Sequence, residues 1–439
     1  MNKNKIIFLL ITLSLLFSLS YNQNSAISIN LELFNNDIEP DNGSYYASSP
    51  YDFFNESKHP RYPLVTRPFS IIQYPNKAHP AIIEYNEEFE VIIEVPRSSN
   101  DWVLKLINGT TSIDLDVTNS KYKEDKRYLT VLPTNNVEGL YDLQLNCSEG
   151  DDYQTHSVKI MEEKKYPFTF VQISDLHLPT YFETGINTTE INFQEFEKIR
   201  ALNPDFIICT GDLMQGPQLL FLNPEGGTMS GESQLKLGLW ALDLLNIPVF
   251  LIGGNHEFSQ SGLVPDNLEE NWYRFMGPLR YQSFNILDWS FVGFGSSFEG
   301  LDLDEKESLD SILNSVANNA NILYYHFDFN GDATRFINKF PIEVALYGHL
   351  HEDNGTIRET NEQFYTLDNT LFHLEGPLYG RYFTHFTVNN QTSLSAKNET
   401  YNFVLRPYTP TKTNAPSYIT FIFSSMIIAI ILKLRKRKV

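Results

Sequence analysis

The residues of this sequence that could do chemistry gather in five short clusters between positions 175 and 351, and each cluster directly follows an apolar run. The cluster residues are imidazoles, carboxylates and one amide: Asp175 and His177; Asp212; Asn255, His256 and Glu257; His326; His349 and His351. Imidazole nitrogens and carboxylate oxygens bind first-row divalent metals, and one carboxylate can bridge two ions through its two oxygens. The residue types therefore predict a site for two metal ions.

The apolar runs before the clusters have the length and composition of β-strands. Helix-like patterns lie between these runs, at residues 190–202, 233–246 and 304–317. Strands that alternate with helices predict a layered α/β fold. Ligands in such folds bind at the carboxyl ends of the strands. We therefore expect the five clusters to converge on one edge of a sheet.

The spacing within the clusters favours the same interpretation. One residue separates Asp175 from His177, and one separates His349 from His351, so both members of each pair face the same side if the strand direction continues. A glycine precedes Asp212, Asn255 and His349, and we expect each glycine to let the chain turn sharply where a strand ends. Each cluster alone is a weak signal, but chance does not explain five of them in this order.

The set of clusters resembles the calcineurin-like metallophosphoesterase superfamily. That pattern is Asp-x-His, Gly-Asp, Gly-Asn-His-Glu/Asp, a lone His and Gly-His-x-His, and here it covers roughly residues 166–405. The resemblance implies a four-layer α/β fold, with two β-sheets packed together and flanked by helices. It also implies metal-dependent hydrolysis of phosphate esters by a hydroxide that bridges two divalent ions. The ligand types suit Mn, Fe or Zn.

The resemblance implies a role for each cluster residue. The residues expected to bind one metal are Asp175, His177 and His351. Those expected to bind the other metal are Asn255, His326 and His349. Asp212 would bridge both ions, and His256 would donate a proton or hydrogen bond toward the leaving oxygen. Glu257 would orient His256 from behind.

The sequence before the clusters predicts an additional domain. Short alternating apolar runs broken by Gly, Asn and Pro over residues 65–162 predict an all-β sandwich of immunoglobulin or fibronectin type. Residues 21–64 have no sustained period and predict a poorly ordered lead-in, and residues 163–410 form the expected metallophosphoesterase domain. Cys147 and Cys209 are the two cysteines of the chain and lie in different segments, so we expect no disulfide between them. Cys209 ends an apolar run and is expected to be buried.

Both ends of the chain carry signals typical of membrane targeting. Two lysines precede an apolar run, which predicts a signal peptide over residues 1–20. Residues 413–434 are uncharged as far as Leu432 and lead into a basic tail at 435–439, which predicts a C-terminal transmembrane anchor and a cytoplasmic tail. The catalytic domain is therefore expected to be extracellular or lumenal. A sorting tail that is cut off is the alternative. Eight Asn-x-Ser/Thr sequons fit a glycoprotein.

The overall charge limits the class of partner. The formal net charge is -21, which argues against binding to nucleic acid because its phosphates would be repelled. A small-molecule or lipid phosphate ester stays compatible with the charge, since metal ions reverse the local field. Monoesters and diesters both remain open as substrates. The alternative function is a catalytically inactive surface adhesion or binding protein that retains a structural metal site.

Overall fold

The computed structural model describes most of the chain between residues 70 and 398. The described ranges are 70–178, 188–215, 231–258, 272–273, 275–276, 280–295, 300–316, 319–349, 364–367, 370–374, 378, 382–391 and 393–398. The predicted signal peptide, lead-in and C-terminal tail lie outside these residues.

The first described part of the chain is an eight-stranded sheet. Its strands are β1 (Ile72–Tyr74), β2 (Ala81–Glu84), β3 (Phe89–Ile93), β4 (Val103–Asn108), β5 (Thr111–Lys123), β6 (Lys126–Pro133), β7 (Gly139–Cys147) and β8 (Gly150–Met161). The strand order is β1-β3-β6-β5-β4-β7-β8-β2. Alternating residues such as Val91, Leu129 and Leu143 are buried in one shared core. That these strands form a domain of immunoglobulin or fibronectin type stays a prediction.

Two further sheets follow. The five-stranded sheet, in the order β11-β10-β9-β18-β19, contains β9 (Phe168–Ile173), β10 (Phe206–Cys209), β11 (Val249–Leu251), β18 (Thr384–Asn390) and β19 (Ser393–Asn398). The six-stranded sheet, in the order β12-β13-β14-β15-β17-β16, contains β12 (Tyr281–Ile286), β13 (Trp289–Phe294), β14 (Ala320–Tyr325), β15 (Val344–Tyr347), β16 (Phe364–Leu367) and β17 (Thr370–Leu374). Strands β9, β10 and β11 are parallel, as are β13, β14, β15 and β17.

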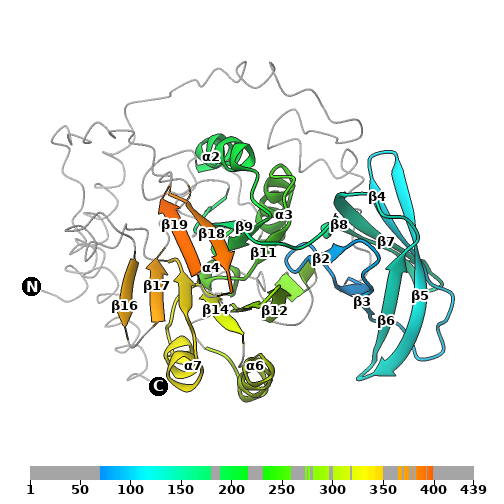
Figure 1. Cartoon of the computed structure of the whole chain (residues 1–439). Helices are drawn as coiled ribbons and strands as arrows, with labels where there is room; N and C mark the ends of the chain where they lie inside the picture. Colours follow the sequence, from blue (N-terminus) through cyan, green and yellow to red (C-terminus); the bar gives the residue numbers. More distant parts are fainter. Residues whose placement is uncertain are drawn as a thin grey trace, which may run out of the picture. The chain divides into compact units, whose positions relative to one another are not determined.

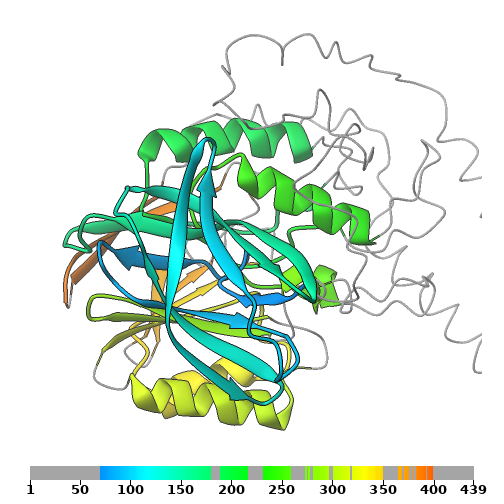
Figure 2. The same cartoon turned by 90° about the vertical axis from the view of Figure 1, so that its right-hand side faces the viewer.

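Helices cover the outer faces of the two sheets, and Figures 1 and 2 show one pair on either side. Helices α2 (Thr188–Leu202) and α3 (Gly231–Asp243) pack on the five-stranded sheet, and α6 (Leu303–Ser315) and α7 (Asp332–Lys339) pack on the six-stranded sheet. A third core between the sheets is rich in stacked phenylalanines, including Phe170 and Phe206. The mixed α/β fold that the sequence predicts is confirmed.

Local sequence explains where the helices begin. Asp302 and Glu305 form a capping box at the start of α6, since each side chain accepts the other residue's backbone N–H. The three predicted helices are present, and each of their ends lies within three residues of the prediction. Both cysteines are free, and Cys209 is buried, as expected.

The eight-stranded sheet is joined to the other sheets through the segment between β1 and β2. Ala78 O accepts a hydrogen bond from the backbone N–H of Leu251 on edge strand β11. His79 Nε2 donates to the backbone carbonyl of Ser283 on edge strand β12, at 3.1 Å. Both contacts cover strand edges that would otherwise expose unpaired backbone groups.

The prediction of a C-terminal membrane anchor is contradicted. Among the residues that the structure describes, no helix is long and apolar enough to cross a membrane. Helix α2, for example, has 15 residues and so extends about 22 Å, against a hydrocarbon layer of about 30 Å. The membrane partner and the membrane-anchored location fall with that prediction. Residues 413–434 themselves lie outside the described part of the chain.

Candidate metal centre

The described cluster residues come together at the carboxyl ends of five strands. Asp175 follows β9 by two residues, Asp212 follows β10 by three, and Asn255 opens the short helix α4 (Asn255–Phe258) after β11. His326 directly follows β14, and His349 follows β15 by two residues. Because these strands run parallel within their sheets, their carboxyl ends meet along one edge, as the sequence predicts.

The backbone of the centre is strained at four positions. Asp175, His177, Asp212 and His349 have φ values of 53°, 46°, 51° and 79°, in the left-handed region. A non-glycine residue there costs on the order of 1–3 kcal/mol unless the surroundings hold it in place. Strain at four neighbouring polar residues is typical of a functional site, because it aims side chains that relaxed backbone would direct elsewhere.

The glycines before the clusters serve two purposes. Gly211 has a φ of 105°, so it provides the sharp turn that was predicted. Gly254 and Gly348 are needed for space: a Cβ would lie 2.3 Å from Asp212 Oδ1 at the first and 1.9 Å from Ser174 Oγ at the second. At Gly254 and Gly348, glycine is therefore required by the lack of space for a side chain, and not by the left-handed turn found at Gly211.

Asp212 lies at the middle of the centre. Its Oδ2 atom is 3.1 Å from His326 Nε2 and 3.7 Å from Nε2 of both His177 and His256. The carboxylate is fully buried, and the groups around Oδ2 are imidazole nitrogens. A buried carboxylate is costly unless positive charge balances it, and a cation would supply that charge.

His326 is oriented by the backbone behind it. Its Nδ1 donates to the carbonyl oxygen of Thr210 at 2.8 Å, which leaves Nε2 to face the centre. Nε2 lies 3.1 Å from Asn255 Oδ1 and 3.2 Å from His349 Nδ1. These atoms, with Asp212 Oδ2, surround one point and have the donor types that a divalent metal prefers.

The potential metal ligands form two groups that share Asp212. One group is Asp212, His326 and His349, and the other is His177, Asp212 and His256. Within each group the ligand atoms lie within 4.8 Å of one another. Asp175 Oδ1 is 3.6 Å from His177 Nε2, and Asp175 Oδ2 accepts the backbone N–H of His349 at 2.9 Å. The described residues therefore fit two metal ions with one shared carboxylate.

His256 and Glu257 make contacts that sequence reasoning did not anticipate. The Nδ1 atom of His256 donates to the backbone carbonyl of Gln215, so this carbonyl holds the ring. The Glu257 carboxylate accepts backbone N–H groups, from Asp212 and Met214 at 3.0 Å each and from Gly254 at 2.7 Å. Glu257 thus ties the loop after β10 to the loop after β11, whereas the resemblance implied that it orients the His256 ring.

The electrostatics of the centre follow from burial and from Asp212. Burial lowers the pKa of His177 to about 4, so this imidazole is neutral, as a metal ligand must be. Burial would also lower the pKa of His326, but the Asp212 carboxylate outweighs it and raises that pKa to about 9. Burial alone would raise the pKa of Asp212. The imidazoles of His326, His256 and His177 have the larger combined effect, so the pKa of Asp212 is lowered. Without metal, a proton on His326 balances the buried carboxylate.

The structure brings eight of the nine predicted site residues together, and His351 lies outside the described residues. Gln215 is a functional candidate that the sequence did not reveal. Its contribution is a backbone carbonyl, and no side-chain pattern signals such a role.

Residues 168–353 match the calcineurin-like phosphoesterase family, Metallophos. A stretch of 97 residues is 33% identical to the DNA double-strand break repair protein Mre11 of Methanococcus maripaludis, covering 21% of this chain and 24% of that protein. The match thus spans about a quarter of the length of that curated relative.

Solved structures with a similar chain course include the sulfate thiohydrolase SoxB of Thermus thermophilus, at 15% identity and a TM-score of 0.34, covering 54% of this chain and 57% of that one. The Thermotoga maritima protein TM1076 is 13% identical with a TM-score of 0.25, and the match covers 53% of this chain and 99% of that one. The family match coincides with the strands and clusters described above. Residues 168–353 of this chain form a calcineurin-like phosphoesterase domain.

Proposed function

We propose that this chain hydrolyses phosphate esters, monoesters or diesters, at a dinuclear metal centre. The observation that carries the proposal is the position of Asp212 Oδ2, buried between two groups of potential metal-ligand atoms. The family match over the same residues supports metal-dependent phosphoester hydrolysis. The proposed organisation is a β-sandwich over residues 65–162 followed by a four-layer phosphoesterase domain over residues 163–410.

The ligand assignment extends this proposal to single residues. One ion is assigned to Asp175, His177 and His351, the other to Asn255, His326 and His349, and Asp212 is shared. When bound, two divalent cations polarise the phosphoryl oxygens and lower the pKa of bound water toward neutrality. Mn, Fe and Zn all suit these ligands.

His256 is the proposed proton donor to the leaving oxygen. Its Nδ1 is occupied by the Gln215 carbonyl, so Nε2 is the atom that carries the exchangeable proton. The His256 side chain remains partly exposed, at 26%, whereas His177 and Asp212 are buried. Among these three groups, His256 is therefore the one that both solvent and a substrate oxygen can reach.

Glu257 has a positioning role in this proposal. Its three amide contacts fix the backbone of Asp212 and Gly254, which flank the shared carboxylate and the Asn255 ligand. Burial raises the pKa of Glu257, the nearby Asp212 carboxylate raises it further, and the amide donors oppose both effects. Loss of Glu257 would loosen two ligand loops together.

An aromatic surface beside the centre indicates the kind of ester. The rings of Phe327 and Phe329 lie 4.7 and 5.0 Å from the His349 ring, centroid to centroid, and both side chains are only half-buried. Half-exposed rings beside a reactive centre can stack on a flat group of a substrate. We therefore propose that the preferred esters carry an aromatic or planar group.

The proposal is tested on the full chain, purified without chelator. Bound metal is measured, and hydrolysis of bis(p-nitrophenyl) phosphate and p-nitrophenyl phosphate is followed with added Mn²⁺ or Zn²⁺. We expect about two metal ions per chain and turnover that chelation abolishes. Bound metal with no turnover of any ester would favour the alternative, a binding protein with a structural metal site. Single- and double-stranded DNA belong in the panel, because part of the chain is similar to Mre11.

A further inference from the structure

The loop that carries Asp175 and His177 packs against helix α2, which contains none of the predicted ligands. The residue between the two, Leu176, is fully buried and belongs to the same apolar core as Phe196 and Ile199 of α2. Figure 1 shows α2 over the sheet that contains β9, the strand from which this loop emerges. The helix therefore lies behind the chain segment that joins two expected ligands of one ion.

A buried amide on α2 donates a hydrogen bond to this loop. The Nδ2 atom of Asn192 donates to the backbone carbonyl oxygen of Leu176 at 2.8 Å, and Asn192 is fully buried. A carbonyl oxygen can only accept, so the contact also fixes which end of the amide faces the loop. Asn192 precedes Phe196 by four residues and Ile199 by seven, which places it on the core-facing stripe of the helix. A polar side chain on such a stripe needs a partner, and here the partner is the backbone of a metal-ligand loop.

The loop needs this support because its backbone conformation is unfavourable. The φ values of Asp175 and His177 are 53° and 46°, in the left-handed region that residues other than glycine rarely adopt. Their N–H groups donate to the carbonyls of Gly211 and Asp212, at 3.0 Å each. Asn192 holds the carbonyl group between them. Strained conformations persist where several such contacts enforce them together.

Removal of the Asn192 amide would leave the Leu176 carbonyl buried without this donor. An unpaired buried carbonyl is unfavourable, so we expect the peptide to rotate toward another donor and to displace His177. The Nε2 atom of His177 lies 3.6 Å from Asp175 Oδ1 and 3.7 Å from Asp212 Oδ2. Ligands have to be held within about 0.5 Å of the geometry that a site requires, so a small displacement is enough to weaken metal binding.

The ligands assigned to the other ion are held by different parts of the fold. His326 Nδ1 donates to the carbonyl oxygen of Thr210 at 2.8 Å, and the backbone N–H of Gly348 donates to the carbonyl oxygen of His326 at 3.0 Å. These contacts join the carboxyl ends of β10, β14 and β15 and do not involve α2. Support from α2 is therefore directed to the half of the centre that contains His177.

We propose that Asn192 is a positioning residue for the ion assigned to Asp175, His177 and His351. It acts through the Leu176 peptide and does not itself contact the ion or the substrate. This inference rests on the proposed dinuclear centre and adds to it a residue from outside the ligand set.

The test replaces Asn192 by leucine, which nearly keeps the size of the side chain and removes the donor. The stepwise Zn²⁺ binding constants of the metal-free full chain are measured by competition with a chromogenic chelator. We expect one of the two constants to fall about tenfold, and the other to change less than twofold. In the His177→Ala background the same replacement should have little further effect, because the ligand that Asn192 positions is already absent.

Asn321→Leu is the matched control. Asn321 is also fully buried, and its Nδ2 donates to the backbone carbonyls of Asn319 and Pro341 at 3.0 and 2.9 Å. It lies near the start of β14, whereas His326 and the metal centre lie beyond the other end of that strand. Both variants should lower the melting temperature, but Asn321→Leu should leave both Zn²⁺ constants unchanged.

If Asn192→Leu does not fold, Asn192→Ala carries the same prediction, since it removes the donor and adds no bulk. The proposal is overturned if the Asn192 variant keeps both Zn²⁺ constants, if both constants fall equally, or if Asn321→Leu weakens Zn²⁺ binding as much. An unaltered chain that binds no Zn²⁺ would overturn the dinuclear centre and this inference with it. Zn²⁺ binding that responds to Asn192 as expected, without turnover of any ester, would refute the proposed hydrolysis alone.

Discussion

Asp212 Oδ2 lies 3.1 Å from His326 Nε2, with both side chains buried, and this contact organises the centre. The two groups come from neighbouring layers of the fold, because Asp212 follows β10 of the five-stranded sheet and His326 follows β14 of the six-stranded sheet. The buried carboxylate must be balanced by positive charge. Without metal the balance comes from a proton on His326, and in the functional protein we propose that it comes from two cations.

Replacement of His256 by alanine tests the proton donor. Its Nε2 is 3.7 Å from Asp212 Oδ2 and its side chain is partly exposed, so kcat should fall about 10²–10⁴-fold while bound metal and melting temperature stay unchanged. The measurement is steady-state turnover of an aryl phosphate ester together with metal analysis. His385→Gln, a half-buried histidine on β18, is the control and should leave kcat unchanged. An equal loss of kcat in both variants would contradict the role of His256 as proton donor.

Replacement of Asp212 by asparagine tests the shared ligand. An amide removes the negative charge on which both metal groups depend, so bound metal should fall from about two ions per chain to below one. Elemental analysis after gel filtration measures this. Asp310→Asn is the control, since Asp310 pairs with Arg335 and Lys339 at the surface and should leave metal content unchanged. A D212N protein that kept both metals would exclude the bridging assignment.

The stability of the metal-free protein should depend on pH through His326. The folded pKa of about 9 exceeds the unfolded value of about 6.5, so the protonated ring stabilises the fold fully below about pH 6.5. That contribution, on the order of 3 kcal/mol at most, is lost as pH rises through about 9. Urea unfolding in excess chelator measures it, and His326→Gln should flatten the profile between pH 6.5 and 9. Metal-loaded protein should instead gain stability as pH rises, because metal binding releases protons from the ligands. Identical slopes with and without chelator would contradict this account.

His79 should give the opposite pH dependence in acid. Its folded pKa of about 4 lies below the unfolded value, because burial disfavours the charged ring. The neutral ring therefore contributes stability above about pH 6.5, and this contribution of about 1–3 kcal/mol is lost as pH falls from 6.5 to 4. The measurement is the difference in free energy of unfolding between the unaltered chain and His79→Gln, both in chelator. A difference that stays constant with pH would show that the ring titrates normally.

Phe329 should influence substrate selection more than the rate of reaction. Its ring lies 5.0 Å from His349, so Phe329→Leu removes a stacking surface and leaves the predicted ligands in place. We expect KM for bis(p-nitrophenyl) phosphate to rise about threefold to tenfold, with kcat changed less than twofold. Methyl p-nitrophenyl phosphate, which has one aryl group fewer, should show a smaller rise. An effect confined to kcat would instead assign Phe329 to the support of His349.

Much of the centre could be predicted because each ligand lies directly beyond an apolar strand. Strand ends of a parallel sheet share one edge, so local patterns were enough to group Asp175, Asp212, Asn255, His326 and His349. The strained backbone at four of the site residues could not be predicted, because left-handed aspartate and histidine residues depend on contacts that only the folded chain provides. The same holds for the amide contacts of Glu257, which join loops 43 and 45 residues apart.

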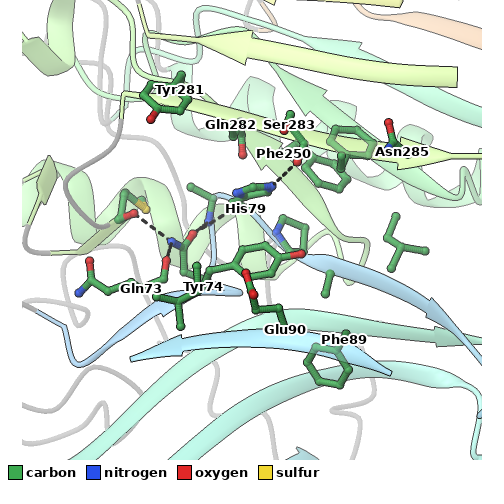
Figure 3. Close-up of a pocket in the computed structure, with 18 of the residues that line it drawn as sticks. Gln73, Tyr74, His79, Phe89, Glu90, Phe250, Tyr281, Gln282, Ser283 and Asn285 are labelled. Atoms are coloured by element: carbon green, nitrogen blue, oxygen red, sulfur yellow. Dashed lines mark hydrogen bonds between the residues drawn. The ribbon is translucent and has the colours of Figure 1, made fainter. Parts of the chain in front are cut away.

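A cavity of about 600 Å³ beside His79, shown in Figure 3, was invisible in the sequence for a related reason. Its walls come from β1, β2, β3, β6, β11 and β12, which meet only when the eight-stranded sheet docks on the edge strands of the other two. His79 carries no signal of that docking in its local pattern. The prediction of a membrane anchor rested on hydropathy alone, which indicated a helix at 413–434. The described residues include no helix that could span a membrane.

The central claim is that two metal ions, gathered around Asp212, make this chain a phosphoesterase. The most direct test strips the purified chain with chelator and titrates Mn²⁺ or Zn²⁺ back, while bound metal and hydrolysis of bis(p-nitrophenyl) phosphate and p-nitrophenyl phosphate are measured together. The account predicts that turnover of at least one ester returns as occupancy approaches about two ions per chain, and that His256→Ala binds the same metal without comparable turnover. Folded protein that binds no metal, or turnover that survives complete chelation, would contradict it.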